Sequence, residues 1–192
     1  MGSLNEVKKA VKIFKKSKSP LVVLQCTSNY PSKIDSANVS VISSYKKIFK
    51  CLVGYSDHTN SNIPAIAAVS QGAMVIEKHF TLSRKLQGID QKASIEPAEF
   101  IKYIKMIREA KISLGDPVKK TTAEEKDSIK SVRRSIVMKK NLLKNSKITK
   151  ALITVKRPGI GISPDNYYNI IGRKLKKNKK EDEILFWKDL KD

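Results

Sequence analysis

The segment Cys51–Thr59 reads CLVGYSDHT, an apolar run that ends in serine, aspartate and histidine. The segment Val75–Leu82, VIEKHFTL, repeats the arrangement and passes from apolar residues to glutamate, lysine and histidine. Short apolar runs of this kind, bounded by polar residues, are typical of strands buried on both faces, as in parallel sheets. His58 and His79 are the two histidines of the chain, and each stands at the end of one such run.

Predicted helices between the apolar runs turn this pattern into a repeating βα unit. The first predicted helix starts with a capping box, Ser3 to Glu6, and ends near Lys18, whereas the last has Pro97 at its first position and Gly115 just after its end. We predict strands at 21–24, 51–55 and 74–78, and helices at 3–17, 35–49, 63–71 and 97–113. Strands and helices that alternate about every 25 to 30 residues indicate a parallel sheet.

The two histidines are candidates for a shared site at one edge of this sheet. In a (β/α) barrel the active site lies at the C-terminal ends of the strands, and both histidines follow such ends on successive strands. Adjacent parallel strands lie about 4.8 Å apart, so imidazoles at matching heights could bind one metal ion. The alternative is that each histidine is an ordinary polar residue with a hydrogen-bond partner.

The chain is strongly basic, with 39 Lys and Arg against 18 Asp and Glu and a formal net charge of +21. A charge of this size suits nucleic acid, an anionic surface or an anionic substrate. However, the excess is spread over the chain, lysine far outnumbers arginine, and aromatic residues are not interleaved with the lysines. This pattern favours a lysine-rich solvated surface and disfavours a nucleic-acid-binding protein, which we keep as the alternative from another functional class.

The cysteines and the apolar runs bear on the compartment. Cys26 and Cys51 each lie in an apolar run, where a free thiol behaves as a small hydrophobic side chain, and we expect no disulfide. We find no signal-peptide pattern, and the longest apolar run is far shorter than the roughly 20 residues that span a bilayer. We therefore expect a cytoplasmic protein with no membrane partner.

Six motifs together resemble one protein family. CTSNYP, VGYSDHT, VIEKHFTL, GIDQKASIEP, RRSIV and VKRPGIGISP occur here in the order found in the N-acetylneuraminate synthase family. The resemblance implies a TIM barrel followed by a small, mostly β, antifreeze-like (SAF) domain. It also implies an enzyme that condenses phosphoenolpyruvate with an N-acetylated amino sugar such as N-acetylmannosamine and releases phosphate. The implied cofactor is a divalent metal, usually Mn²⁺, with Mg²⁺ or Co²⁺ as alternatives, and the implied assembly is a homodimer.

The resemblance also implies a role for each matching side chain. His58 and His79 would be metal ligands, and Glu77 and Asp90 would hold the metal-bound water and the sugar hydroxyls. Ser56 would bind the phosphate, and Asn29 and Tyr30 would lie in a loop that contacts the sugar. Arg157 would contact the sugar that is bound by the neighbouring subunit. The alternatives are that Glu77 and Asp90 are helix-cap or turn residues, that Asn29 forms an Asx-turn before Pro31, and that Arg157 is a surface residue.

The loop around Asp90 departs from the family pattern. The family commonly reads GPDHKAS, whereas residues 88–94 here read GIDQKAS, so a proline and a histidine beside Asp90 are absent. We expect a looser loop and an altered sugar preference. The retained KAS residues favour a sialic or legionaminic acid type of enzyme over the pseudaminic branch.

The predicted domains are a partial TIM barrel at 1–115, a linker at 116–131 and the SAF domain at 132–192, with short strands at 135–138, at Ile148 and at 152–155. A complete barrel needs about 250 residues. We therefore expect residues 1–115 to supply the C-terminal half, about four βα units, and the chain to act with a separately encoded N-terminal half. A non-catalytic remnant is the alternative, and in either case we expect this chain alone to be inactive.

Overall fold

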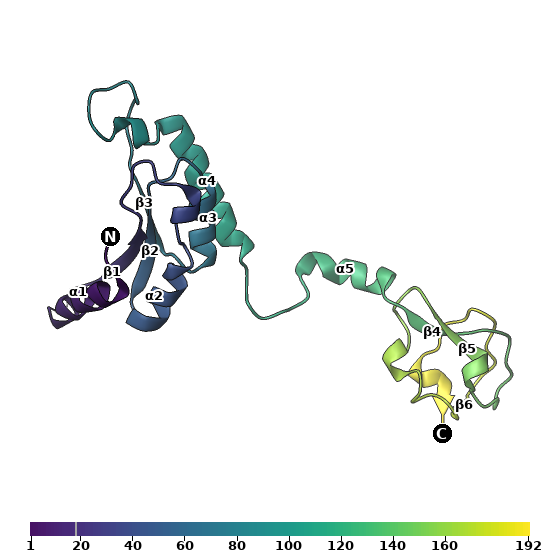
Figure 1. Cartoon of the computed structure of the whole chain (residues 1–192). Coiled ribbons are helices and arrows are strands. Elements are labelled where there is room, and N and C mark those ends of the chain that lie inside the picture. Colours follow the sequence, from purple (N-terminus) through teal and green to yellow (C-terminus); the bar gives the residue numbers. More distant parts are fainter. Residues whose placement is uncertain (18) are drawn as a thin grey trace. The chain divides into compact units, whose positions relative to one another are not determined.

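The computed structural model describes residues 1–17 and 19–192, which form two compact units, Met1–Pro117 and Val118–Asp192 (Figure 1). Each unit has its own cluster of buried hydrophobic side chains. Among the described residues, no helix combines the length and the apolar character needed to cross a bilayer.

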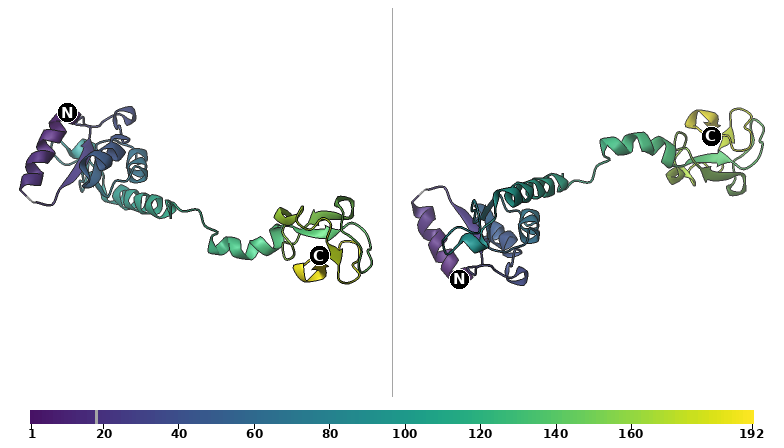
Figure 2. Two further views of the ribbon diagram at one scale, coloured as in Figure 1. Left: turned by 90° about the horizontal axis from the view of Figure 1, so that it is seen from below. Right: turned by 90° about the horizontal axis from the view of Figure 1, so that it is seen from above.

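The first unit is a parallel α/β layer. Its elements are α1 (Leu4–Lys16), β1 (Val22–Cys26), α2 (Val41–Phe49), β2 (Leu52–Asp57), α3 (Ile63–Ser70), β3 (Val75–Lys78) and α4 (Pro97–Ser113), with short 3₁₀ turns at Ile34–Ser36 and Gln91–Ala93. The strands are parallel and ordered β1-β2-β3. Helices α2 and α3 contact the sheet, and α4 packs on α3 (Figures 1 and 2). The predicted parallel sheet and its three strands are confirmed.

Local signals in the sequence explain where the outer helices begin. Ser3 and Glu6 form the predicted capping box of α1, in which the Glu6 carboxylate accepts from Ser3 N at 2.7 Å. Pro97 is the first residue of α4, where its missing N–H costs no hydrogen bond. The predicted end of the first helix near Lys18 lies outside the described residues, and α1 itself ends at Lys16.

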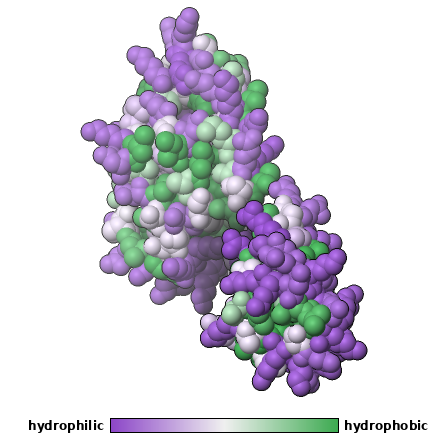
Figure 3. Space-filling view, turned by 90° about the vertical axis from the view of Figure 1, so that its right-hand side faces the viewer, coloured by the Kyte–Doolittle hydropathy of each residue, from purple (hydrophilic) through white to green (hydrophobic). Residues whose placement is uncertain are grey.

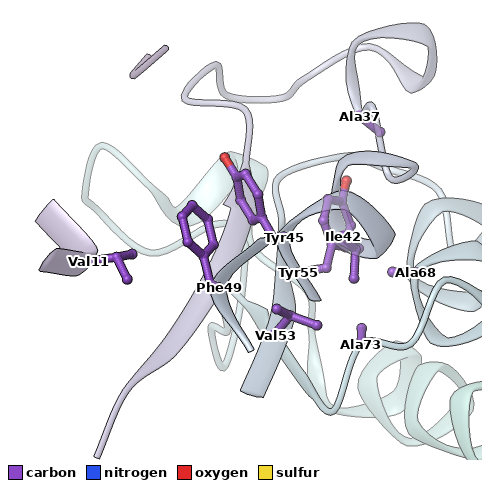
Figure 4. Close-up of a cluster of buried hydrophobic side chains, with 9 residues drawn as sticks. All are labelled: Val11, Ala37, Ile42, Tyr45, Phe49, Val53, Tyr55, Ala68 and Ala73. Atoms are coloured by element: carbon purple, nitrogen blue, oxygen red, sulfur yellow. The ribbon is translucent and has the colours of Figure 1, made fainter. Parts of the chain in front are cut away.

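Side chains alternate between the two faces of the sheet, and this alternation builds the core. Val53 and Tyr55 on β2 point to the helix side, where they pack with Ile42 and Phe49 of α2 (Figure 4). The intervening residues of β2 face the opposite side, and at the N-terminal end of that strand Leu52 is 55 % exposed. The helices therefore bury one face of the sheet, while the other face presents Ser56 and its neighbours.

Three expectations for the chain order need correction. The first unit contains three βα units preceded by α1, and not about four. The helix expected from residue 35 begins at Val41, because a 3₁₀ turn and the left-handed backbone of Asn38 (φ 47°) interrupt it. The stretch expected as a linker contains α5 (Ala123–Val132), which starts with a capping box formed by Thr122 and Glu125.

The second unit also contains two short antiparallel strand pairs. These are β4 (Ser135–Met138) with β5 (Ile153–Lys156), and β6 (Lys174–Leu175) with β7 (Leu190–Lys191). The predicted strand at 135–138 is confirmed, and the one at 152–155 is shifted by one residue. Ile148 forms no strand. It is fully buried, and its backbone bonds to Arg173 and Gly172, so the apolar residue marks a core position rather than an extended segment.

The surface matches the high content of charged residues. Figure 3 shows hydrophilic residues over much of this face of both units, with hydrophobic residues in smaller areas between them. With 30 % charged residues in the chain, such a surface keeps a basic protein well solvated.

The second unit encloses a buried ion pair. The side chains of Lys179 and Asp189 are each 2 % exposed, with Nζ 2.7 Å from Oδ2. Lys179 also pairs with Glu183 at 2.7 Å, and Asp189 accepts from Phe186 N at 3.1 Å and pairs with Lys177 at 3.3 Å. Burial by itself would raise the pKa of the Asp189 carboxyl, but the hydrogen bonds from Lys179, Phe186 N and Lys177 outweigh it and hold this pKa below its usual value.

The lowered pKa of Asp189 predicts an acid-sensitive contribution to stability. A depressed folded-state pKa stabilises the fold above the unfolded-state pKa of about 4 and ceases to do so as the pH falls through the folded-state value. We expect Asp189→Asn to reduce the free energy of unfolding by about 3 kcal/mol at neutral pH, since Lys179 loses its buried partner. The difference from the wild type should shrink as the pH falls below about 4.

Trp187, the one tryptophan of the chain, lies in this unit, so urea unfolding followed by its fluorescence reports the unit directly. The control is Asp192→Asn, which changes a carboxylate that is 96 % exposed and should leave the pH profile unchanged. A pH-independent loss in Asp189→Asn would contradict the assignment.

Candidate functional site

The C-terminal ends of the three parallel strands bring the predicted site residues of the first unit together. His58 directly follows β2, and His79 directly follows β3. Their ring centroids lie 5.1 Å apart, and the ring planes are nearly perpendicular at 79°. Ser56 and Glu77 are register partners in the sheet, and Ser56 Oγ donates to Glu77 Oε1 at 2.6 Å. The expectation that neighbouring strand ends place the two imidazoles side by side is confirmed.

The hydrogen bonds around His58 define its neutral tautomer. His58 is buried, and its Nδ1 lies 2.9 Å from the carbonyl oxygen of Thr27, which can only accept, so Nδ1 carries the proton. Ser56 Oγ lies 3.4 Å from Nε2, but its single hydrogen is used on Glu77. Within the described part of the chain, the Nε2 lone pair therefore receives no hydrogen bond from Ser56. A metal-binding histidine has this arrangement, in which one nitrogen donates to a carbonyl and the other is free to coordinate.

The loop after β1 covers both histidines. The ring of Tyr30 lies 4.2 Å from that of His58 and 5.2 Å from that of His79, measured between centroids, and Tyr30 is 48 % exposed. The Tyr30–Pro31 peptide bond is cis. The side-chain oxygen of Asn29 accepts from Tyr30 N at 3.1 Å, so this amide is engaged by its own loop. Tyr30 therefore lies over the imidazole pair, at the boundary with solvent.

Asp90 approaches the site from the loop after β3. Its Oδ2 lies 3.8 Å from His79 Nδ1, and its side chain is 60 % exposed. Ser94 Oγ donates to the Asp90 carbonyl at 2.7 Å, and Thr81 is hydrogen-bonded to Gln91, the residue that replaces the family's histidine. The departure from the family pattern thus leaves a loop that is tied back to β3 and still places a carboxylate beside His79.

A buried polar network lies on the other face of the same strand ends, and the sequence reasoning missed it. Asp57 and Lys78 form an ion pair at 3.0 Å, and Tyr103 of α4 donates to Asp57 at 2.8 Å. Burial, and then the charge of Asp57, raise the pKa of Tyr103 far above its ordinary value. The signal in the sequence was a charged residue directly before each histidine, at a position that alternation turns toward the helices.

Arg157 belongs to the second unit. It is exposed, directly follows β5 and precedes Pro158 through a cis peptide bond. The distances given above for the strand ends therefore involve only residues of the first unit.

The donor set of the first unit suits a hard or borderline divalent cation with open coordination positions. Among the described residues no cluster of three or more His, Cys, Asp or Glu side chains is arranged to enclose a metal ion. Two imidazoles with carboxylates nearby could hold such an ion and would leave coordination positions for water, as catalytic metal sites do.

The tautomer of His58 can be measured directly, because the chain has two histidines. At about pH 8 we expect nitrogen NMR to show His58 protonated at Nδ1 and bare at Nε2. Spectra of His58→Gln and His79→Gln assign the two rings. A dominant Nε2–H form of His58 would contradict the hydrogen bond to Thr27.

Both units of the chain are similar to known proteins. The model of the NeuB family matches residues 1–119, and that of the SAF domain matches residues 133–191. The N,N'-diacetyllegionaminic acid synthase of Campylobacter jejuni is 39 % identical over 188 residues, which are 96 % of this chain and 56 % of that protein. The human N-acetylneuraminate-9-phosphate synthase is 32 % identical over 188 residues, 96 % of this chain and 52 % of its own.

A solved structure is similar as well. The N-acetylneuraminic acid (sialic acid) synthetase of Leptospira borgpetersenii, crystallised with citrate, has a TM-score of 0.62 and 40 % identity, covering 67 % of this chain and 45 % of its own. The chain spans about half the length of the curated relatives it matches.

Proposed function

This chain belongs to the NeuB family and carries a SAF domain, and on that premise we propose that it supplies the histidine-bearing part of a nonulosonic acid synthase. The reaction joins C3 of phosphoenolpyruvate to the aldehyde carbon of an open-chain N-acetylated amino sugar, such as N-acetylmannosamine. Water adds to C2, and phosphate leaves with cleavage of its C–O bond. The observation that carries the proposal is the pair of imidazoles, 5.1 Å apart, beside the Ser56–Glu77 hydrogen bond.

His58 and His79 would hold a divalent metal, Mn²⁺ by preference and Mg²⁺ or Co²⁺ as alternatives. When bound, such an ion stabilises negative charge on the sugar aldehyde oxygen and orients water. The free Nε2 of His58 and the mixed nitrogen and oxygen donors support this assignment. Glu77, which accepts a hydrogen bond from Ser56, would hold the metal-bound water and accept its proton as it adds.

The remaining side chains of the first unit would bind the substrates. The Ser56 hydroxyl, which now donates to Glu77, would donate to a phosphate oxygen when the substrate is bound, because a hydroxyl can rotate from one acceptor to another. Asp90, exposed beside His79, would accept hydrogen bonds from sugar hydroxyls. Tyr30 and Asn29 would contact the sugar from above the histidines. We propose a sialic or legionaminic acid type of product, following the KAS residues at 92–94.

The number of strands and Arg157 each suggest a partner. The described first unit has three parallel strands, whereas a closed barrel of this class has eight. We propose that a separately encoded N-terminal half supplies the remaining strands and the other groups that bind the phosphate. We also propose a homodimer in which Arg157 of one subunit binds the N-acetyl end of the sugar held by the other, a task that suits the planar guanidinium. The cytoplasmic location stays a prediction.

Metal binding tests the site. Titration calorimetry of the purified chain with Mn²⁺ should show a specific binding event that His58→Ala and His79→Ala each abolish, since each removes one of two protein nitrogens. Asp35→Asn, which neutralises an exposed carboxylate of the same unit, should bind like the wild type. Unchanged binding in either histidine variant would exclude the pair as the metal site.

Turnover tests the reaction and Arg157. The chain alone should release phosphate from phosphoenolpyruvate at background rate, since each missing preorganised donor costs roughly 10² to 10³ in rate. With the region of the Campylobacter relative that lies outside the matched 56 % supplied as a second polypeptide, activity should appear. Arg157→Ala should then raise the KM for the sugar severalfold and leave the KM for phosphoenolpyruvate nearly unchanged. Full activity of the chain alone would contradict the need for a second polypeptide. Equal increases of the KM values for both substrates in Arg157→Ala would contradict the role of Arg157. No activity after complementation would favour a non-catalytic remnant.

A further inference from the structure

A buried ion pair lies directly behind the two histidines. Asp57 and Lys78 are the residues that precede His58 and His79, and they are register partners on β2 and β3. Lys78 Nζ lies 3.0 Å from Asp57 Oδ2, and the two side chains are 6 % and 0 % exposed. Because side chains alternate along a strand, this pair faces the helices, on the opposite side from Ser56 and Glu77.

Both oxygens of the Asp57 carboxylate accept hydrogen bonds. Oδ1 accepts from the backbone N and the hydroxyl of Thr59 at 2.9 and 2.8 Å, and Oδ2 accepts from Lys78 and from the Tyr103 hydroxyl at 3.0 and 2.8 Å. Lys78 also donates to the carbonyl of Thr59 at 2.7 Å. The network thus holds the residue after His58, the residue before His79 and helix α4 in one arrangement.

Side-chain interactions consequently join the two strand ends on both faces of the sheet. Asp57 and Lys78 join β2 to β3 on the helix side, and Ser56 and Glu77 join them on the side of the imidazoles. A one-residue change of register would break both links at once and turn every side chain to the wrong face.

Stability by itself gives little reason for a charged pair at this position. Taking two charges out of water has a large desolvation cost, and hydrophobic residues of similar volume are often as stabilising as a buried ion pair. What a buried and hydrogen-bonded pair adds is one defined geometry. That geometry is needed here, because metal affinity depends on how closely two imidazole nitrogens match the coordination sphere.

We propose that the Asp57–Lys78 ion pair is a positioning device that fixes the separation and the mutual orientation of His58 and His79. Both residues act through the backbone of the histidine that follows. The consequence for metal affinity rests on the proposed function, whereas the effect on the two rings does not.

The test uses the double variant Asp57→Asn/Lys78→Met in the full chain. Lys78→Met alone would leave a buried carboxylate without its cation and disrupt the fold, so the double variant, which is neutral at both positions, carries the test. Two controls accompany it. Val53→Ala opens a cavity in the core on the helix side of β2, and Tyr103→Phe removes one hydrogen bond but keeps the ion pair.

The first readout is the contact between the two imidazoles in metal-free protein. With two histidines in the chain, their ring protons can be assigned from single variants, and rings 5.1 Å apart should give a nuclear Overhauser effect. We expect this effect in the wild type and in both controls, and its loss in a folded double variant. A folded double variant that keeps the ring contact of the wild type would overturn the proposal, because the pair would then serve stability alone.

The second readout is Mn²⁺ affinity by calorimetry. We expect the double variant to bind at least about tenfold more weakly than the wild type, as for other groups that orient metal ligands, and the controls to bind within a factor of about two of it. Equal weakening in Val53→Ala would assign the loss to general destabilisation and overturn the proposal. If the wild type itself binds no Mn²⁺, the proposed metal site fails, and the ring contact still decides the role of the ion pair.

Discussion

The pairing register of β2 with β3 is the constraint on which the site depends. Ser56 lies opposite Glu77, and Asp57 lies opposite Lys78, so the two strand ends finish at the same height. The next residue on each strand is a histidine, and the rings meet at 5.1 Å. Gly54 helps to set this register, because a Cβ at that position would collide with the Val75 carbonyl of β3. The roles proposed for Ser56, Glu77 and the two histidines follow from this alignment.

Alternation of side chains gives the two faces of the strand ends different properties. On the helix side the Asp57 carboxylate and the Lys78 ammonium are buried and paired with each other, and Tyr103 of α4 donates to the carboxylate, at a position where an unpaired charge would be very costly. On the other side Ser56 and His58 are buried, Glu77 is exposed and His79 is half-buried, and these groups keep unused lone pairs beside Tyr30. The polar groups of the first face are paired with one another, while the second face keeps groups that can bind ligands. The proposed site, which would hold a cation and two substrates in a fixed geometry, would benefit from this division.

The second unit places a buried ion pair inside a small core in a comparable way. Lys179 and Asp189 connect the segment before Glu183 to the turn that leads into β7, and around them pack fully buried aliphatic residues such as Ile136 and Leu185. In a unit of this size few apolar residues are available, and a satisfied polar network restricts the alternative packings. In both units, therefore, charged side chains at buried positions define the arrangement of neighbouring segments.

The sequence by itself determined the parallel α/β class and the three strands, because these follow from local periodicity. It also determined the helix starts at Ser3 and Pro97, which follow from capping. The geometry of parallel sheets then placed His58 and His79 at neighbouring strand ends. It did not determine helix α5, whose capping box lies in a stretch with little hydrophobic pattern, or the core role of Ile148. Only the tertiary structure decided the tautomer of His58, the Asp57–Lys78–Tyr103 network and the Lys179–Asp189 pair. Each of these joins residues that are distant along the chain, and their contacts depend on register and packing, which no local pattern of residues contains.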